Sequence, residues 1–312
     1  MHLAKLAYDE TGRGIYEDKA IKNLYASEYI WNSIKDNKTV GIIGEDKQKG
    51  LTYVAEPIGV ICGVTPTTNP TSTTIFKAMI AIKTGNPIIF AFHPSAQQSS
   101  KHAAKVILEA AIKAGAPKDC IQWIEIPSIE ATKQLMNHKD IALVLATGGS
   151  GMVKSAYSTG KPALGVGPGN VPTYIEKTAH TKRAVNDIIG SKTFDNGMIC
   201  ASEQVMVVDK EVYTDVVKEF KLHQTYFVNK NELQQLEDAI MNEDKTAVKP
   251  DIVGKSAVDI AKLSGISVPE KTKLLVAEID GIGNDYPLSR EKLSPLLAMV
   301  TAKSTRHALQ IC

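Results

Sequence analysis

One cysteine stands where a nucleophile could act on a substrate. Cys200 lies in a short stretch between an expected helix at residues 181–193 and an expected strand at residues 204–208. The dipeptide Asn196-Gly197, just before it, permits positive φ, so the chain can bend sharply ahead of the sulfur. A thiolate is a strong nucleophile, and a loop on a rigid scaffold can present it to a substrate. Because most cysteines are simply buried, the rest of the chain must decide between a structural thiol and a catalytic one.

The composition is that of an ordinary globular protein and excludes several functional classes. The 312 residues suffice for two domains, and a formal net charge of +2 gives no case for nucleic acid as a partner. The chain has no apolar run of about 18 residues that could cross a membrane, and its N-terminus lacks a signal-peptide core. The four cysteines have no metal-binding spacing and the seven histidines are scattered, so we expect no metal site. Four cysteines in a chain of this length indicate reduced thiols in the cytoplasm.

Apolar runs and helical patterns alternate along most of the chain. Expected strands that are apolar throughout lie between expected helices, at residues 58–64, 87–92, 121–126 and 141–146. Such strands form a parallel sheet that helices cover on both faces, and ligands bind at the carboxyl ends of the strands. A second α/β series starts near Val171. We therefore predict an α/β protein with one domain at residues 1–170, which carries a hairpin arm at about 41–55, and a second at residues 171–312.

A glycine-rich turn follows the last of these four strands. Its residues are Thr147, Gly148, Gly149, Ser150 and Gly151, and an expected helix begins around residue 152. Bare amides and the positive end of the helix dipole make such a turn a plausible seat for phosphate. The pattern is not GxGxxG, and a plain strand-to-helix turn would explain it about equally well.

Three segments give the chain a family resemblance. The run Thr65-Pro66-Thr67-Thr68-Asn69-Pro70, the turn at 147–151 and the segment from Lys192 to Gln204 resemble motifs of the aldehyde dehydrogenase superfamily, in its coenzyme A-acylating branch. They are most similar to the aldehyde dehydrogenase domain of bifunctional aldehyde–alcohol dehydrogenases, and the resemblance covers nearly the whole chain. It implies an aldehyde dehydrogenase-like fold in which Cys200 is the nucleophile. Asn69 and the Cys200 amide would hold the oxyanion; the alternative is that Asn69 is a turn or helix-cap residue.

The same resemblance implies an NAD(H) site in the first domain, with the phosphates on the turn at 147–151. The residues implied to bind the cofactor are Thr147, Gly148, Gly149, Ser150, Gly165, Val166, Gly167, Pro66, His93 and Glu291. The family's counterpart of Glu291 holds the nicotinamide ribose, although an isolated glutamate is ordinarily a surface acid. His93 stands where the family usually has a lysine that contacts the adenosine ribose, which leaves the choice between NAD and NADP open.

The loop at residues 164–167 distinguishes two branches of the family. Hydrolytic members have Glu-Leu-Gly-Gly here, and the glutamate activates the water that cleaves the thioester. This chain has Leu-Gly-Val-Gly, without a carboxylate, which fits release of the acyl group to a thiol. The resemblance therefore implies reversible conversion of acetyl-CoA and NADH into acetaldehyde, CoA and NAD. The alternatives are a hydrolytic aldehyde dehydrogenase and a structural segment of a filament-forming bifunctional enzyme.

Domains of this family extend further than this chain at both ends. We therefore expect a fragment whose catalytic domain, at residues 171–312, is incomplete at its C-terminus. Such a fragment need not be active by itself. The resemblance implies a homo-oligomer or a filament for the full-length protein.

Overall fold

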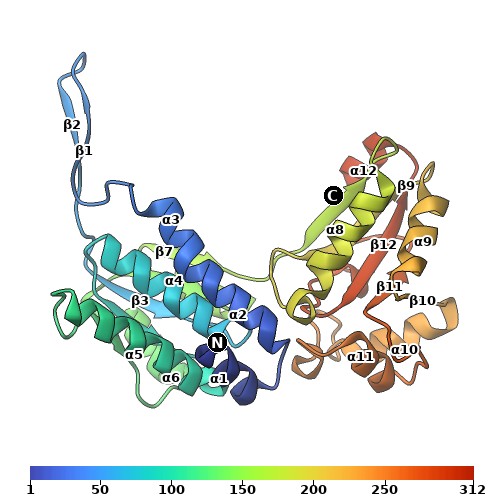
Figure 1. Ribbon diagram of the computed structural model, residues 1–312, viewed down its shortest axis with the longest axis horizontal. Coiled ribbons are helices and arrows are strands. Elements are labelled where there is room, and N and C mark those ends of the chain that lie inside the picture. The colour runs from blue at the N-terminus through green and yellow to red at the C-terminus, as the bar shows by residue number, and fades with distance from the viewer. The chain divides into compact units, whose positions relative to one another are not determined.

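The computed structural model describes all residues from Met1 to Cys312, and these form two compact units (Figure 1). Unit 1 comprises Met1–Gly12 and Tyr16–Pro168, and unit 2 comprises Arg13–Ile15 and Gly169–Cys312. Each unit has its own parallel sheet and its own hydrophobic core. None of the helices combines the length and the apolarity needed to span a bilayer.

Unit 1 is built on a five-stranded parallel sheet in the order β5-β4-β3-β6-β7. The strands are β3 (Val60–Val64), β4 (Ile88–Ala91), β5 (Ile121–Trp123), β6 (Ile141–Thr147) and β7 (Ala163–Val166). From β3 the chain adds strands first on one side and then, from β6, on the other. The strand order therefore reverses between β3 and β6, and the crevice at their carboxyl ends is where sheets of this kind bind ligands.

Helices cover both faces of this sheet, as the continuous apolar strands predict. On one face α4 (Pro70–Lys83) and α5 (Gln97–Lys113) pack against strand residues that include Ile61 and Phe90. On the other face α6 (Ile129–Asn137) and α7 (Ser150–Tyr157) pack against a cluster that includes Cys62. A short 3₁₀ turn, η2 (Pro94–Ala96), leads from β4 into α5.

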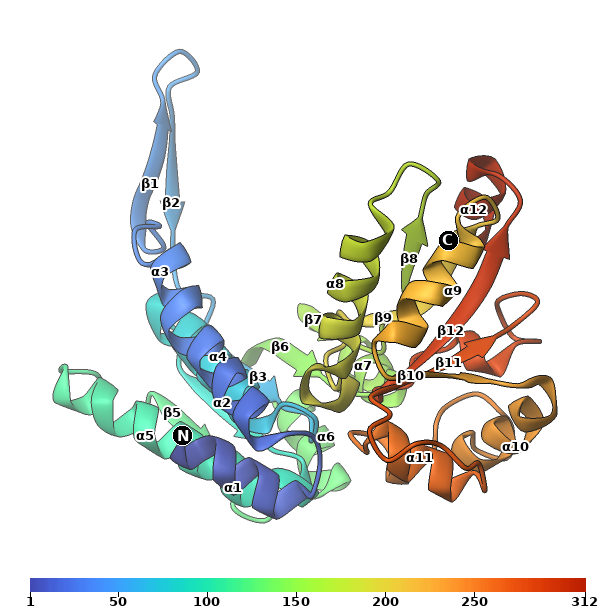
Figure 2. The same cartoon turned by 45° about the vertical axis from the view of Figure 1, so that its right-hand side comes forward.

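The N-terminal part of unit 1 is helical and ends in a hairpin. Its elements are α1 (His2–Thr11), α2 (Tyr16–Leu24), the π-helical turn η1 (Tyr25–Tyr29), α3 (Ile30–Ile34), β1 (Gly41–Asp46) and β2 (Leu51–Ala55). The helices α1 and α2 and the turn η1 pack on α4 and α5, whereas the antiparallel pair β1–β2 projects away from the helices of unit 1 (Figure 2). The hairpin occupies the residues at which the sequence predicts an arm.

Unit 2 is built on a second parallel sheet, in the order β10-β11-β12-β9-β8. Its strands are β8 (Val171–Ile175), β9 (Glu203–Asp209), β10 (Thr225–Val228), β11 (Leu274–Glu278) and β12 (Leu296–Ala302). On one face lie α8 (Thr181–Thr193) and α9 (Tyr213–Leu222); on the other lie α10 (Lys230–Ile240), α11 (Ala257–Leu263) and α12 (Thr305–Ile311). Three 3₁₀ turns complete the unit: η3 (Phe194–Gly197), η4 (Pro250–Ile252) and η5 (Pro287–Ser289).

Two features differ from the sequence expectation. Strand β5 ends at Trp123 rather than at residue 126, and the carbonyls of Ile124 and Glu125 just beyond it accept hydrogen bonds from the Gln97 side chain. The tripeptide Arg13–Ile15 belongs to unit 2 although the helices on either side of it belong to unit 1. Nothing in three residues between two helices indicates such a long-range packing partner.

Candidate active site

The turn before Cys200 has an unusual backbone. Asp195, Asn196 and Gly197 have φ angles of 47°, 51° and 70°, so three consecutive residues adopt the left-handed conformation. Asparagine and aspartate tolerate this region better than other side chains, and glycine adopts it freely. The sequence expectation of a sharp bend at Asn196-Gly197 is confirmed. The bend brings the chain to the surface, where Cys200 is exposed.

Contacts from three distant segments fix this turn within unit 2. The buried Asp195 carboxylate accepts a hydrogen bond of 2.6 Å from the Ile15 amide. Asn196 Nδ2 donates to the Gly254 carbonyl at 2.9 Å. A Cβ atom at Gly197 would lie 2.6 Å from the Ser294 carbonyl, so no other residue fits there. The turn that precedes Cys200 is therefore fixed by the fold.

Gly169 brings Cys200 and Glu291 into one site. The Gly169 amide donates to Glu291 Oε1 at 3.1 Å, and a Cβ atom at Gly169 would lie 3.0 Å from the Cys200 carbonyl oxygen. Glu291 is partly buried and has a defined partner, so it is not the free surface acid of the alternative interpretation. Burial raises the pKa of the Glu291 carboxyl, an effect that the Gly169 amide and the charges of Lys192 and Lys292 partly offset.

Two buried lysines and a glutamine join the segments that carry Cys200 and Glu291. Gln204 Oε1 accepts from Lys192 Nζ at 3.1 Å and from the Lys292 amide at 3.0 Å. Lys292 Nζ in turn donates to the Gln204 carbonyl at 3.0 Å. Burial lowers the pKa of Lys192 to about 7 and holds the pKa of Lys292 well below its usual value. This Lys192–Gln204–Lys292 cluster ties the end of α8, the start of β9 and the Glu291 segment together.

Unit 1 contains a cavity of about 460 Å³ at the carboxyl ends of β3, β4 and β6. This is the crevice at which the strand order reverses, and the volume is in the usual range for small-molecule sites. The predicted residues that line it are Pro66, His93, Thr147, Gly148 and Gly149. The other lining residues are mainly apolar and include Val64, Phe92, Ile129 and Met152. The structure thus brings together predicted residues that are up to 83 positions apart (Pro66 and Gly149).

The start of α7 at this cavity is suited to an anion. Gly149 is the N-cap residue, and no side chain caps the helix. The first N–H groups of a helix have no partner within it, and the helix dipole is positive at this end. A Cβ atom at Gly149 would meet nothing within 4 Å, so the approach to these amides is open. Ser150, the first helical residue, is exposed at the same turn.

The loop at 164–167 lies beside this cavity's helix and does not line the cavity. A Cβ atom at Gly165 would lie 2.8 Å from Val153 and 2.9 Å from Tyr157, so glycine is needed for β7 to pack on α7. Gly167 also faces Val153, whereas the Val166 side chain is exposed. Packing therefore accounts for Gly165 in full, and cofactor contacts of these three residues stay a prediction.

Asn69 is the N-cap residue of α4, but its side chain does not cap the helix. Its Oδ1 atom instead accepts a hydrogen bond of 2.7 Å from Lys22 Nζ, and its Nδ2 atom donates to Thr68 Oγ1 at 3.2 Å. The helix-cap interpretation thus lacks its characteristic bond. Asn69 belongs to unit 1, whereas Cys200 and Glu291 belong to unit 2.

The sequence profile of the aldehyde dehydrogenase family matches residues 2–245, which is most of the chain. The chain belongs to the aldehyde dehydrogenase family. It is 57% identical over 314 aligned positions to the aldehyde-alcohol dehydrogenase of Streptococcus pneumoniae, a match that covers 98% of this chain and 36% of that protein. The chain therefore spans about a third of the length of that relative.

Solved aldehyde dehydrogenase structures share this fold. An acetylating aldehyde dehydrogenase from Geobacillus thermoglucosidasius is 49% identical with a TM-score of 0.95, over 99% of this chain and 68% of that chain. A propionaldehyde dehydrogenase from Rhodopseudomonas palustris, solved with bound CoA and an acylated cysteine, is 32% identical with a TM-score of 0.85, over 99% of this chain and 70% of that chain. The prediction of an aldehyde dehydrogenase-like α/β fold is confirmed.

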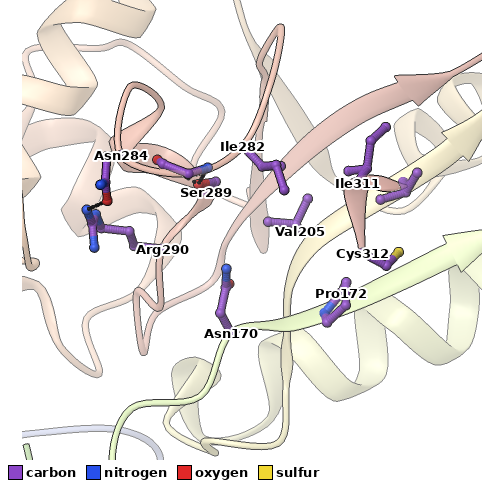
Figure 3. A pocket seen from close by; sticks show the side chains of 11 residues that line it. Asn170, Pro172, Val205, Ile282, Asn284, Ser289, Arg290, Ile311 and Cys312 are labelled. Carbon is purple, nitrogen blue, oxygen red and sulfur yellow. Dashed lines mark hydrogen bonds between the residues drawn. The ribbon is translucent and has the colours of Figure 1, made fainter. Parts of the chain in front are cut away.

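Unit 2 also contains a smaller pocket of about 200 Å³ (Figure 3). Val205 and Val207 of β9 and Ile311 of α12 contribute apolar lining, and on its polar side Arg290 donates to Asn284 Oδ1 at 2.7 Å. None of the residues that the sequence assigned to catalysis or to the cofactor lines this pocket.

Sequence reasoning missed the polar residues that support the site. Lys22 contacts Asn69, and Lys192, Gln204 and Lys292 support Glu291 and the segment after Cys200. Lysine is ordinarily a surface residue, so its type gives no hint of a buried role. Only their positions in the sequence could have indicated this role. Lys292 directly follows the predicted Glu291, and Gln204 ends the predicted nucleophile segment.

Proposed function

We propose that this chain provides the acyl-transfer site of a CoA-acylating aldehyde dehydrogenase that interconverts acetyl-CoA and NADH with acetaldehyde, CoA and NAD. The observation that carries the proposal is the exposed Cys200 on a turn fixed by buried contacts, next to the hydrogen-bonded pair Gly169–Glu291. A rigid turn and an accessible sulfur are what a cysteine nucleophile needs. The similarity to acetylating aldehyde dehydrogenases supports the same reaction class.

The residues would divide the chemistry as follows. When the aldehyde is the substrate, the Cys200 thiolate attacks its carbonyl carbon and forms a C–S bond, while the carbonyl oxygen takes the negative charge. The Cys200 amide and Asn69 Nδ2 donate hydrogen bonds to that oxygen, and a preorganised donor of this kind typically contributes about 3–4 kcal/mol to the transition state. The hydride on the same carbon would need an acceptor, which is the chemistry that bound NAD would supply. Cys200 then holds the acyl group as a thioester until the CoA thiol displaces it.

The cofactor would bind with its phosphates at the start of α7 and its adenosine in the cavity of unit 1. The amides after Gly149 offer hydrogen bonds, and the apolar lining suits a nucleoside. Glu291 would hold the nicotinamide ribose, since a carboxylate accepts hydrogen bonds from two hydroxyls. His93 lies in the same lining and takes the place of the lysine usual in the family.

Release to CoA rather than to water follows from the loop at 164–167. No carboxylate is available there to activate a water molecule, so the thioester at Cys200 should persist until a thiol arrives. The propionaldehyde dehydrogenase with an acylated cysteine and bound CoA supports this order of events. Acetyl is proposed as the acyl group because of the similarity to the acetylating enzyme.

Acylation of the thiols tests the proposal directly. The protein is incubated with acetyl-CoA, and the adduct is mapped by mass spectrometry while free CoA is titrated. We expect one acetyl group per chain, on Cys200, and none on Cys62, which is buried and whose pKa burial raises to about 12. Cys312, which is also exposed, is the internal control for non-specific transfer. Equal labelling of Cys200 and Cys312, or none at Cys200, would refute the proposal.

A further inference from the structure

A lysine from α2 holds the carboxamide of Asn69. Lys22 Nζ lies 2.7 Å from Asn69 Oδ1, and both side chains are partly buried in unit 1. The two residues are 47 positions apart, so the contact depends on the packing of α2 on α4 and not on local sequence.

We propose that Lys22 is a positioning residue for acyl transfer, which fixes the Asn69 carboxamide so that its N–H is presented to the oxyanion. The inference rests on the proposed function, in which Asn69 is the oxyanion donor. It goes further by naming the group that decides which way the carboxamide points.

The chemistry of the two side chains determines this orientation. A lysine ammonium has donor hydrogens and no acceptor, so the carboxamide must turn its oxygen toward Lys22. Nδ2 then points away from Lys22 with two donor hydrogens, of which one binds Thr68 Oγ1 at 3.2 Å. The other hydrogen remains for a substrate oxygen. A cation on the oxygen side also polarises the amide, which strengthens its N–H as a donor.

A second hydrogen bond fixes α2 independently of this contact. Thr71 Oγ1, in the first turn of α4, donates to Asn23 Oδ1 at 2.8 Å, and both residues are buried. Because Asn23 directly follows Lys22, this bond holds the lysine's backbone over the start of α4. The position of Lys22 is therefore set by the fold, and little ordering is needed when a substrate binds. Catalytic donors gain most when their supporting groups are rigid in this way.

The test is the rate of acetyl transfer from acetyl-CoA to Cys200 in a single turnover, followed by intact mass. Lys22→Met removes the ammonium and keeps the apolar stem, so the carboxamide is free to rotate. We expect transfer to slow by about 10- to 100-fold, as for a catalytic group displaced by about 1 Å. Lys22→Arg retains a cationic donor and should restore most of the rate.

Three controls separate positioning from a general loss of structure. Alkylation of Cys200 by iodoacetamide proceeds by direct displacement and forms no oxyanion, so Lys22→Met should leave its rate unchanged. Lys35→Met removes an exposed lysine that also contacts an asparagine oxygen, that of Asn32 at 3.3 Å, and should change neither rate. In an Asn69→Ala background, Lys22→Met should have no further effect, because the group through which Lys22 acts is gone.

Each outcome decides the matter. Slower acylation with unchanged alkylation, and no additional loss in the Asn69→Ala background, supports the inference. An unchanged acylation rate, a parallel loss of both rates, or an equal loss with and without Asn69 overturns it while leaving the proposed function intact. Failure of the unaltered chain to acylate Cys200 overturns the proposed function, and the inference with it.

Discussion

Gly169 and Glu291 are 122 residues apart in the sequence and are joined by a hydrogen bond of 3.1 Å from the glycine amide to the carboxylate. The bond engages Oε1 of Glu291, and the second carboxylate oxygen, Oε2, could accept a hydrogen bond from a ligand. A Cβ atom at the same glycine would lie 3.0 Å from the Cys200 carbonyl oxygen, so the segment of the proposed nucleophile and the proposed ribose ligand both lie beside Gly169. A shift of either segment would move the other.

We expect Glu291→Gln to weaken NADH binding by about tenfold or more, because a hydrogen bond to a charged group contributes roughly 1.5–3 kcal/mol. The glutamine oxygen can still accept from the Gly169 amide, so the fold should be kept. NADH fluorescence titration measures the affinity, and the exposed Glu270→Gln in the same unit is the matched control. An unchanged dissociation constant would show that the ribose is held elsewhere.

Two glycines of unit 1 should respond in opposite ways to the same substitution. Gly149→Val adds side-chain atoms in open space at the start of α7, so its free energy of unfolding should change by less than about 1 kcal/mol. It should nevertheless weaken NADH binding strongly, because the new atoms occupy the approach to the amides that we propose bind the phosphates. Gly165→Val forces atoms against Val153 and Tyr157 and should cost about 1–3 kcal/mol of stability. Urea unfolding measures the stability of both variants, and NADH titration measures their affinity. A large loss of stability in Gly149→Val, or none in Gly165→Val, would contradict the prediction.

Gln204→Leu should destabilise unit 2. The substitution leaves Lys192 Nζ and the Lys292 amide without their acceptor in a fully buried site, at a cost of about 3 kcal/mol. Hydrogen exchange should speed up in β9 and in residues 288–294, which the cluster joins. Gln234→Leu removes an exposed glutamine of α10 and should have little effect. Equal protection in both variants would mean that the buried cluster contributes no stability.

The stability of unit 1 should depend on pH through Lys77, whose buried Nζ donates to the carbonyls of Val64 at 2.6 Å and Leu145 at 2.8 Å. Burial lowers the pKa of Lys77 to about 7, whereas an unfolded lysine keeps its proton to a pH of about 10.4. Between these values the unfolded chain binds the extra proton. The free energy of unfolding must therefore rise with pH, by up to about 1.4 kcal/mol per pH unit, and this contribution is lost as the pH falls toward 7.

Lys77→Met should remove that slope. Both tryptophans, Trp31 and Trp123, belong to unit 1, so tryptophan fluorescence during urea unfolding at pH 7, 8 and 9 reports on the right unit. The exposed Lys105→Met is the matched control and should retain the slope of the unaltered chain. The same slope in all three proteins would show that Lys77 keeps its proton when folded.

The acyl-enzyme should discharge to CoA much faster than to water. The thioester is first formed on Cys200 from acetyl-CoA, and free CoA is removed by gel filtration. Intact mass then follows the loss of the acetyl group in buffer and after addition of CoA. If the acetyl group is lost at the same rate with and without CoA, another residue must activate water in place of the carboxylate that is missing at 164–167.

Most elements of the fold could be predicted because their signals are local. The expected helix at 181–193 coincides with α8, since its apolar residues repeat with the helical period, and the continuous apolar runs predicted β3 and β6. The bend at Asn196-Gly197 was equally predictable, because its residue types determine its backbone.

The rest depends on contacts between distant residues. Lys192, Gln204 and Lys292 have the types of surface residues, and only the folded chain shows that they share a buried site. The bond between Lys22 and Asn69 and that between Ile15 and Asp195 are likewise invisible in a linear sequence. The supports of the site were therefore harder to predict than the residues that they position.

The bond from the Ile15 amide to Asp195 also sets an order of events during synthesis. Its two partners leave the ribosome 180 residues apart, which takes about 10–40 s at ordinary elongation rates. During that interval the residues of unit 1, which end at Pro168, can already fold. The tripeptide Arg13–Ile15 cannot form its contacts with unit 2 until Asp195 has been synthesised. Cys200 emerges only five residues after Asp195. The turn that precedes Cys200 is therefore completed by contact with a tripeptide that was synthesised 180 residues earlier.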